Sequence, residues 1–165
     1  MSAKGATPQA SRSPAEQRRL ETTLRDLFEK RICFNEVLGL KVEALDSGSL
    51  GLGFDMRPDL IGHYQHERLH GGVISAALDT TGGAAILWAI ACKHIDEDTE
   101  HVMHRFSRLG TVDLRIDYLR PGIGRHFLAS ATVTRLGGRI ASTQMRLEND
   151  AGMLIATGSA AYVVS

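Results

Sequence analysis

The sequence predicts an α+β domain in which one long, apolar helix packs against antiparallel strands. Three observations lead to this class: alternating segments after residue 40, a run of small and apolar residues over 72–92, and further alternating segments after residue 110. A helix placed between two groups of strands buries its surface against the sheet that they form. The chain has 165 residues, which suffice for one domain with a substantial core and not for two.

Charge and hydropathy exclude several classes of function. Lysine plus arginine and aspartate plus glutamate both number 19, so the chain lacks the basic excess of a nucleic-acid-binding protein. The longest apolar run, residues 84–92, is too short to span a membrane. Cys33 and Cys92 form no motif and are expected to be buried free thiols in a reducing cytosol. We therefore expect a cytoplasmic protein with no nucleic-acid or membrane partner.

A polar segment precedes an amphipathic helix at the start of the chain. Residues 1–13 lack the apolar stretch of a secretory signal; their serine and arginine content is similar to a transit peptide, but we predict a disordered tail. Ser13-Pro14-Ala15-Glu16 is a capping box with proline at the first helical position. Apolar residues then follow at helical spacing: Leu20, Leu24, Leu27, Phe28 and Ile32. This pattern predicts a helix over 14–33 that packs on the sheet, with a membrane-surface role as the alternative.

Strands are predicted on both sides of the long helix. Residues 40–44 and 50–54 alternate around a turn at 46–48, which indicates a hairpin, and a loop rich in histidine, glycine and charge covers 57–69. After a polar excursion over 93–110, a strand at 111–119 ends at Arg120-Pro121-Gly122. The last three strands are expected at 127–136, 140–147 and 154–163, the first two joined by a Gly137-Gly138 turn.

The stretch HGGVISAALDTTGGAA, residues 70–85, holds the candidate site. It reads as a buried helix with a single acid, Asp79, and an unpaired carboxylate in such a place is costly to desolvate. The carboxylate either caps a loop, pairs with an arginine or acts in catalysis. Gly71 and Gly72 begin the helix, where unpaired N–H groups and the helix dipole favour a negative oxygen, although both glycines also suit a plain helix entry.

The spacing of Asp79 and Gly71 predicts a dimer. Eight residues of helix span about 12 Å, so the two residues of one chain cannot act on the same atom. A two-fold dimer that sets two such helices side by side would place each acid against the glycines of the other chain.

Several motifs together carry a family resemblance. H-G-G-V-I-x-x-x-L-D, the Tyr-Leu-Arg-Pro strand end, the Leu-Gly-Gly-Arg turn and the closing Ala-x-Gly-x-Ala-x-Tyr strand resemble the hotdog-fold acyl-CoA thioesterases of the PaaI type, and among them the YigI-like branch. The resemblance covers 34–165, so a single domain over 14–165 would comprise the helix at 14–33 and a hotdog core. It implies a long central helix wrapped by a curved antiparallel sheet, and assembly into homodimers and often homotetramers. It further implies hydrolysis of fatty-acyl-CoA or aryl-acyl-CoA without a cofactor, and the YigI-like pattern favours medium or long aliphatic chains.

The resemblance also implies roles for residues of the motif. Asp79 matches the catalytic carboxylate, acting as general base or as nucleophile. Gly71 matches the residue whose N–H polarises the thioester carbonyl, while Gly72 supports that turn and His70 orders the loop. Two positions depart from the family. Six residues before His70, relatives often carry an asparagine, whereas this chain has Tyr64, beside His63, and either residue is a candidate substitute. One helical turn after the acid, some relatives carry threonine or serine, whereas this chain has Gly83.

Other site interpretations remain beside these. Arg120, Arg135 and Arg139 lie at strand ends or at the Gly-Gly turn, where they are candidate contacts for CoA phosphates or else simply solvated. The spacing of His63, His66 and His70 suggests zinc, but the surrounding glycines indicate a loop and no glutamate or cysteine completes a pattern, so we expect no metal. A hotdog module that binds acyl-CoA without turnover is the main alternative function. A hotdog dehydratase would need its histidine and acid at a different spacing.

Overall fold

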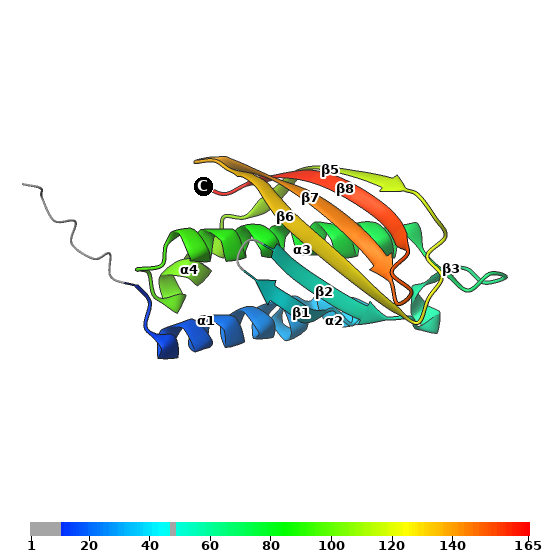
Figure 1. Ribbon diagram of the computed structural model, residues 1–165, viewed down its shortest axis with the longest axis horizontal. Coiled ribbons are helices and arrows are strands. Elements are labelled where there is room, and N and C mark those ends of the chain that lie inside the picture. The colour runs from blue at the N-terminus through cyan, green and yellow to red at the C-terminus, as the bar shows by residue number, and fades with distance from the viewer. Residues whose placement is uncertain (1–10, 47–48) are drawn as a thin grey trace, which may run out of the picture.

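The computed structural model describes residues 11–46 and 49–165, and it has a curved antiparallel sheet wrapped around a long helix (Figure 1). The central helix is α3 (Gly71–Lys93), and the sheet has six strands in the order β1-β2-β6-β7-β8-β5. Their bounds are β1 (Lys41–Asp46), β2 (Ser49–Asp55), β5 (Gly110–Tyr118), β6 (His126–Leu136), β7 (Ile140–Asn149) and β8 (Leu154–Val163). The predicted α+β class and the six long strands are therefore confirmed.

The core lies between the sheet and α3, and small residues on the helix let the two approach closely. In β2, Leu52 and Phe54 are buried, and Phe54 stacks on Phe127 of β6 with ring centroids 5.5 Å apart. A Cβ atom added at Gly82 would lie 2.2 Å from the Tyr162 hydroxyl oxygen and 2.7 Å from the Met145 sulfur. Glycine is therefore required at position 82, because any side chain would collide with the sheet.

Burial along α3 is uneven. From Thr81 to Trp88 every residue is buried, whereas most of the first two turns are partly exposed. The helix was expected to be buried nearly all round, and this holds from Thr81 to Trp88 but not for its first two turns or for its last two residues. The helix has the length and hydropathy of a membrane span, but 67% of its most apolar window is buried inside the domain, as in the core helix of a soluble protein.

The N-terminal helix ends in a π-helical turn. Helix α1 (Pro14–Asp26) begins at the predicted cap, where the Ser13 side chain accepts a hydrogen bond from Glu16 N–H. The chain then continues as the π-helical turn η1 (Leu27–Arg31) and a short helix α2 (Cys33–Leu38). The helix expected over 14–33 is thus present from Pro14 to Arg31, and its last turn is π-helical, which apolar spacing alone does not distinguish from an α turn.

Two segments expected to be irregular contain short elements. The loop over 57–69 holds a 3-10 turn, η2 (Pro58–Leu60), and a small hairpin formed by β3 (Ile61–His63) and β4 (Arg68–Leu69). The polar excursion after α3 holds helix α4 (Thr99–Phe106), which is capped by the Asp98 side chain. Helix α4 packs against both α1 and α3.

The remaining expectations concern the tail and the cysteines. The predicted disorder of residues 1–10 and the turn at 47–48 lie outside the described residues. Within the predicted tail, Arg12 is ordered and its guanidinium bonds to backbone carbonyls of the α3–α4 connection. Cys33 and Cys92 are free thiols but are exposed, so the expectation that they are buried was wrong. Each cysteine lies on the exposed face of its helix, and the apolar residues beside it in the sequence do not indicate this exposure.

Candidate active site

Asp79 is held by hydroxyl groups from two neighbouring strands. It lies half-buried in the middle of α3, and Oδ1 accepts a hydrogen bond of 2.9 Å from the Thr111 hydroxyl of β5. The Tyr162 hydroxyl of β8 lies 3.2 Å from the same oxygen and 2.9 Å from the Asp79 carbonyl. Thr111 and Tyr162 are paired in the register of β5 and β8, so the sheet itself delivers both groups to the acid.

These contacts explain how a carboxylate is tolerated in an apolar helix. Burial and the nearby Asp79 carboxylate raise the pKa of Tyr162, so the phenol stays protonated and donates. In the described part of the chain, no lysine, arginine or histidine forms an ion pair with Asp79. The alternative in which the acid pairs with an arginine is therefore not observed within one chain. Among the described residues, the Asp79 carboxylate is thus contacted by neutral hydroxyl groups and paired with no cation.

A pocket of about 170 Å³ opens beside Asp79. Its polar side contains Asp79, Thr80 and Thr111, and its apolar side is formed by Phe28, Ile32, Phe106 and Leu109. Gly83 lies on the same helix face, one turn after the acid, and also lines the pocket. Asp79 thus stands where an apolar cavity meets polar groups, an arrangement that suits a ligand with a reactive polar group and an apolar tail.

The glycine end of the motif begins α3 and is built differently. His70 is the N-cap, and its Nδ1 atom accepts a hydrogen bond of 2.8 Å from Gly72 N–H. The Tyr118 hydroxyl donates to the Gly71 carbonyl over 3.1 Å. Across residues 11–46 and 49–165, no group accepts a hydrogen bond from Gly71 N–H. The Gly71 N–H is thus free to bind an oxygen, at the end of the helix where the dipole is positive.

Gly71 and Asp79 line different depressions of the chain. Gly71 borders a shallow one with Arg68, Tyr118 and Arg120, and the Arg120 guanidinium donates to the Leu154 carbonyl over 2.8 Å. Of the substrate-binding candidates, the structure therefore places Gly83 beside the acid and Arg120 beside the glycines. One chain does not bring the two halves of the motif together.

The other predicted residues lie away from both halves. His63 and Tyr64 belong to the β3–β4 hairpin, where Tyr64 is 83% exposed and the His63 ring stacks on His66. Neither lines the pocket beside Asp79. His70 turns to Gly72 N–H, and the described residues contain no cluster of three potential metal ligands. The zinc interpretation therefore gains no support from the geometry.

Arg135 and Arg139 flank the β6–β7 turn, at Gly137 and Gly138. The two turn glycines line a separate surface hollow with Lys93, His94 and Arg105. The arginine positions are therefore outside both depressions that hold the motif.

Sequence reasoning missed four polar residues around the acid. Thr111 and Tyr162 were assigned to strands without a role, and Asn35 and Thr80 were not singled out chemically. Asn35 is only 1% exposed, and its side chain accepts a hydrogen bond of 3.3 Å from the Thr80 hydroxyl. Their common signal is a polar side chain in a buried or strand-edge position, which becomes informative only once the strand register is known.

Comparisons with known proteins agree with this architecture. A sequence model described as the thioesterase superfamily matches residues 66–156. The medium/long-chain acyl-CoA thioesterase YigI of Salmonella typhimurium is 35% identical over 139 residues, which cover 84% of this chain and 90% of that protein. The chain belongs to the thioesterase superfamily. YigI of Escherichia coli is 34% identical over the same share of both chains.

Solved structures of thioesterase proteins are also similar to this chain. A protein of Shewanella oneidensis related to the thioesterase superfamily superposes with a TM-score of 0.85 at 33% identity, covering 93% of this chain and 99% of its own. A protein of Syntrophus aciditrophicus gives a TM-score of 0.80 at 34% identity, covering 92% and 99%. The resemblance to hotdog thioesterases is confirmed, and the protein is a thioester hydrolase.

Proposed function

We propose that this hydrolase cleaves medium- or long-chain acyl-CoA to a free acid and CoA. One observation carries the proposal: the Asp79 carboxylate, held by Thr111, borders a pocket with an apolar wall. The sequence around this acid lies within the segment shared with YigI, whose name gives that substrate class. Hydrolysis by a carboxylate and a backbone donor requires no metal or organic cofactor, and we expect the reaction to take place in the cytoplasm.

The proposed chemistry uses Asp79 and Gly71 on opposite sides of the thioester. As general base, Asp79 takes a proton from water as the water oxygen adds to the thioester carbonyl carbon. As nucleophile, its carboxylate adds to that carbon directly and water then hydrolyses the resulting anhydride. In either case the carbonyl oxygen becomes negative, Gly71 N–H donates to it, and the carbon–sulfur bond breaks to release the CoA thiolate. In a single turnover in ¹⁸O-water, label found in Asp79 identifies the nucleophile route, because general-base hydrolysis places ¹⁸O only in the released acid.

The two groups would meet across a homodimer. Strand β5 is an edge of the sheet, and it exposes Val112 and Tyr118. Such an edge readily pairs with another strand. The same strand contacts Asp79 through Thr111 and Gly71 through Tyr118. If two copies of β5 paired antiparallel about a two-fold axis near Leu114, Thr111 would lie opposite Tyr118 of the partner subunit, and each acid would face the glycines of the other chain. We further propose that dimers pair again into tetramers, as the family resemblance implies.

Thiol release from a panel of acyl-CoA substrates tests the proposed function. The panel runs from acetyl-CoA to stearoyl-CoA and includes phenylacetyl-CoA as the aryl alternative. We expect the highest kcat/KM among the medium and long aliphatic chains. A preference for the aryl substrate, with no turnover of chains longer than six carbons, would contradict the substrate class.

Calorimetry on the same panel tests the non-catalytic alternative. Tight binding of acyl-CoA by the wild-type protein without any hydrolysis would identify a binding module instead of an enzyme. This alternative rests on the atypical Tyr64, which is exposed on the hairpin and not beside the acid.

A further inference from the structure

We propose that the N-terminal helical segment and α4 together form the chamber for the acyl chain, and that Phe106 and Gly83 set the chain length it accepts. The inference rests on the proposed function and adds the residues that determine its specificity. The chamber is the pocket beside Asp79, whose apolar wall combines Phe28 and Ile32 with Phe106 and Leu109.

The wall joins two segments that are far apart in the sequence. Phe28 belongs to η1 and Phe106 ends α4, and their rings meet edge to face with centroids 5.9 Å apart at 80°. Phe28 is 2% exposed, while Ile32, Phe106 and Leu109 are only partly buried, because part of their surface borders the cavity. Apolar side chains left incompletely covered beside a carboxylate are suited to an aliphatic ligand.

A buried asparagine fixes the wall relative to the acid. The Asn35 side chain donates to the Phe28 carbonyl over 3.0 Å, which satisfies a backbone group within the π-helical turn. Its amide oxygen accepts a hydrogen bond from Thr80, the residue next to Asp79. Asn35 therefore connects the turn that carries Phe28 to the part of α3 that carries the carboxylate, so the chamber has a defined position beside the reacting group.

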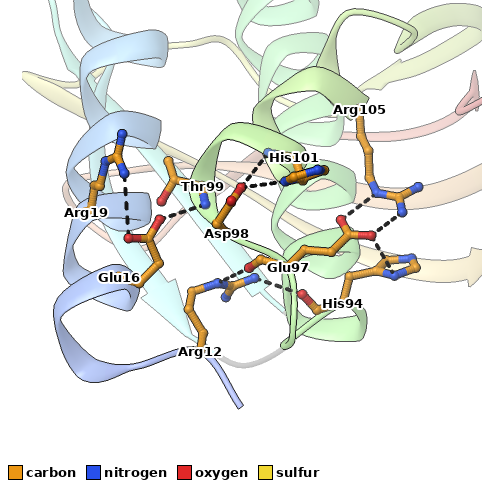
Figure 2. A network of polar contacts seen from close by, with 9 residues as sticks. All are labelled: Arg12, Glu16, Arg19, His94, Glu97, Asp98, Thr99, His101 and Arg105. Atoms are coloured by element: carbon orange, nitrogen blue, oxygen red, sulfur yellow. Dashed lines mark hydrogen bonds and ion pairs between the residues drawn. The ribbon is translucent and has the colours of Figure 1, made fainter. Parts of the chain in front are cut away.

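A polar network fastens the other end of the same two segments. Figure 2 shows Arg12 and Glu16 reaching from the N-terminal segment to the connection between α3 and α4. The Arg12 guanidinium donates to the carbonyls of Ala91, His94 and Glu97 over 2.9–3.1 Å. Glu16 accepts a hydrogen bond of 2.8 Å from Thr99 N–H at the start of α4. The N-terminal segment is thus attached to α4 at both ends of α4, and the two act as one wall.

Gly83 provides the space on the opposite side of the chamber. A Cβ atom added there would lie 3.5 Å from Leu109 Cδ2 and 3.8 Å from Tyr162 Cε1, which are ordinary contacts. Packing therefore does not require glycine at position 83, in contrast to its neighbour Gly82, where a Cβ would collide with Tyr162. Glycine is disfavoured inside a helix relative to alanine. A glycine without a packing reason, beside the acid and lining the cavity, is explained by the room that it leaves for a ligand.

Two variants with opposite effects on the chamber test the inference. Gly83→Ala adds a methyl group inside it, and we expect kcat/KM for the longest accepted chains to fall about 10-fold while short chains are unaffected. The same change should raise Tm by about 2–4 °C, since alanine is the better helix former. Phe106→Leu enlarges the chamber. We expect the preferred acyl chain to lengthen by about two carbons, because each further methylene group that is buried there strengthens binding.

Matched controls separate chamber effects from general ones. Gly138→Ala changes a glycine with nothing within 4 Å of an added Cβ, and Phe127→Leu truncates a buried ring in the sheet outside the chamber. Neither control should move the chain-length optimum. The inference is overturned if Gly83→Ala and Phe106→Leu scale the rates equally at every chain length.

Binding measurements keep this inference distinct from the proposed function. Calorimetry with a series of non-hydrolysable acyl-CoA thioethers should give the same shifts in preferred length for the same variants. If the wild-type protein hydrolyses no acyl-CoA, the proposed function fails while these binding shifts still support the chamber. If it hydrolyses acyl-CoA but the variants leave both profiles unmoved, the chamber fails and the proposed function stands.

Discussion

Asp79 and Gly71 lie eight residues apart on α3, yet their surroundings differ in what one chain supplies. Around Asp79, the chain provides two hydroxyl donors and an apolar cavity. Around Gly71, it provides a capped helix start and an N–H without an acceptor among the described residues, beside a shallow, open depression. In the proposed function, the acid end supplies the carboxylate and the chamber, and the glycine end supplies the N–H donor.

Strand β5 contacts both ends and forms an edge of the sheet in the described part of the chain. It carries Thr111, which bonds to Asp79, and Tyr118, which bonds to Gly71. In the proposed mechanism each end is half of a site, and the edge strand between them is where we propose that a second copy pairs.

The largest effect is expected from removing the base at the acid end. Asp79→Asn preserves the shape of the side chain and an oxygen that can accept from Thr111, so the fold should be retained. We expect kcat to fall by about 10²–10⁴-fold, the usual contribution of a general base. Thiol release with medium-chain acyl-CoA measures the change, and turnover at the wild-type rate would remove Asp79 from the mechanism.

A similar loss is expected from removing the donor at the glycine end. Gly71 is the first residue of α3, where proline is well tolerated, and His70 before it has an extended backbone at φ −64° and ψ 137°. Gly71→Pro removes the N–H and adds a ring that the first helical position tolerates, so we expect kcat to fall by about 10²–10³-fold with the fold intact.

Gly71→Ala is the matched control for the proline variant. It keeps the N–H, and its added Cβ would lie 3.5 Å from the Tyr118 ring, an ordinary contact. The alanine variant should retain most of the activity. If both variants are equally impaired, the side chain and not the N–H matters at this position.

A smaller effect is expected from the residues that position Asp79. Thr111→Val removes the hydroxyl that donates to Oδ1 and keeps the branched shape on an exposed strand position. We expect kcat to fall about 10-fold with little change in KM, in line with the loss of one hydrogen bond to a charged group. Thr111→Ser restores the hydroxyl and should restore kcat. A rise in KM without a change in kcat would instead indicate a role in binding.

The smallest effect concerns a site away from both ends and separates stability from catalysis. His126 contacts Asp55 and Glu43, and the hydrogen bond to Asp55, followed by Glu43, raises the pKa of His126. The protonated form is favoured by folding, so its stabilisation is complete below about pH 6.5 and disappears as pH rises through the raised pKa.

His126→Gln is therefore expected to lower the free energy of unfolding at pH 6 by about 0.5–1 kcal/mol and to leave it nearly unchanged at pH 9. Urea denaturation at both pH values measures this, and kcat should stay at the wild-type value. A fall in kcat of the folded variant would contradict this separation of stability from catalysis.

Much of the fold was predictable from local patterns. Alternation and glycine turns predicted the bounds of β6 and β8 within one residue, and the capping box predicted the start of α1 at Pro14. Strand alternation, glycine turns and a capping box are each defined by residues close together in the sequence. Helix α4 was missed because it is short and is held by distant groups, such as Glu16 on Thr99 N–H. The π-helical turn was missed for the same reason, since Asn35 supports it from outside the turn.

Of the candidate site, only the residues on α3 were predictable from the sequence. Asp79 and Gly71 stand out because a lone acid and paired glycines are anomalous in a helix. Thr111 and Tyr162 carry no such local signal, and their contact with the acid depends on the register of β5 and β8. Tyr64 was chosen by its position relative to His70, but the hairpin places it in solvent.

The most direct test of a shared site is complementation between two inactive variants. Asp79→Asn and Gly71→Pro protomers are purified separately, shown to be inactive, then mixed under conditions that exchange subunits. In a mixed dimer, the intact Asp79 of one chain meets the intact Gly71 of the other. The account predicts recovery of about a quarter of the wild-type activity at equal mixing, since half of the dimers are mixed and each has one complete site. No recovery despite proven subunit exchange would contradict it.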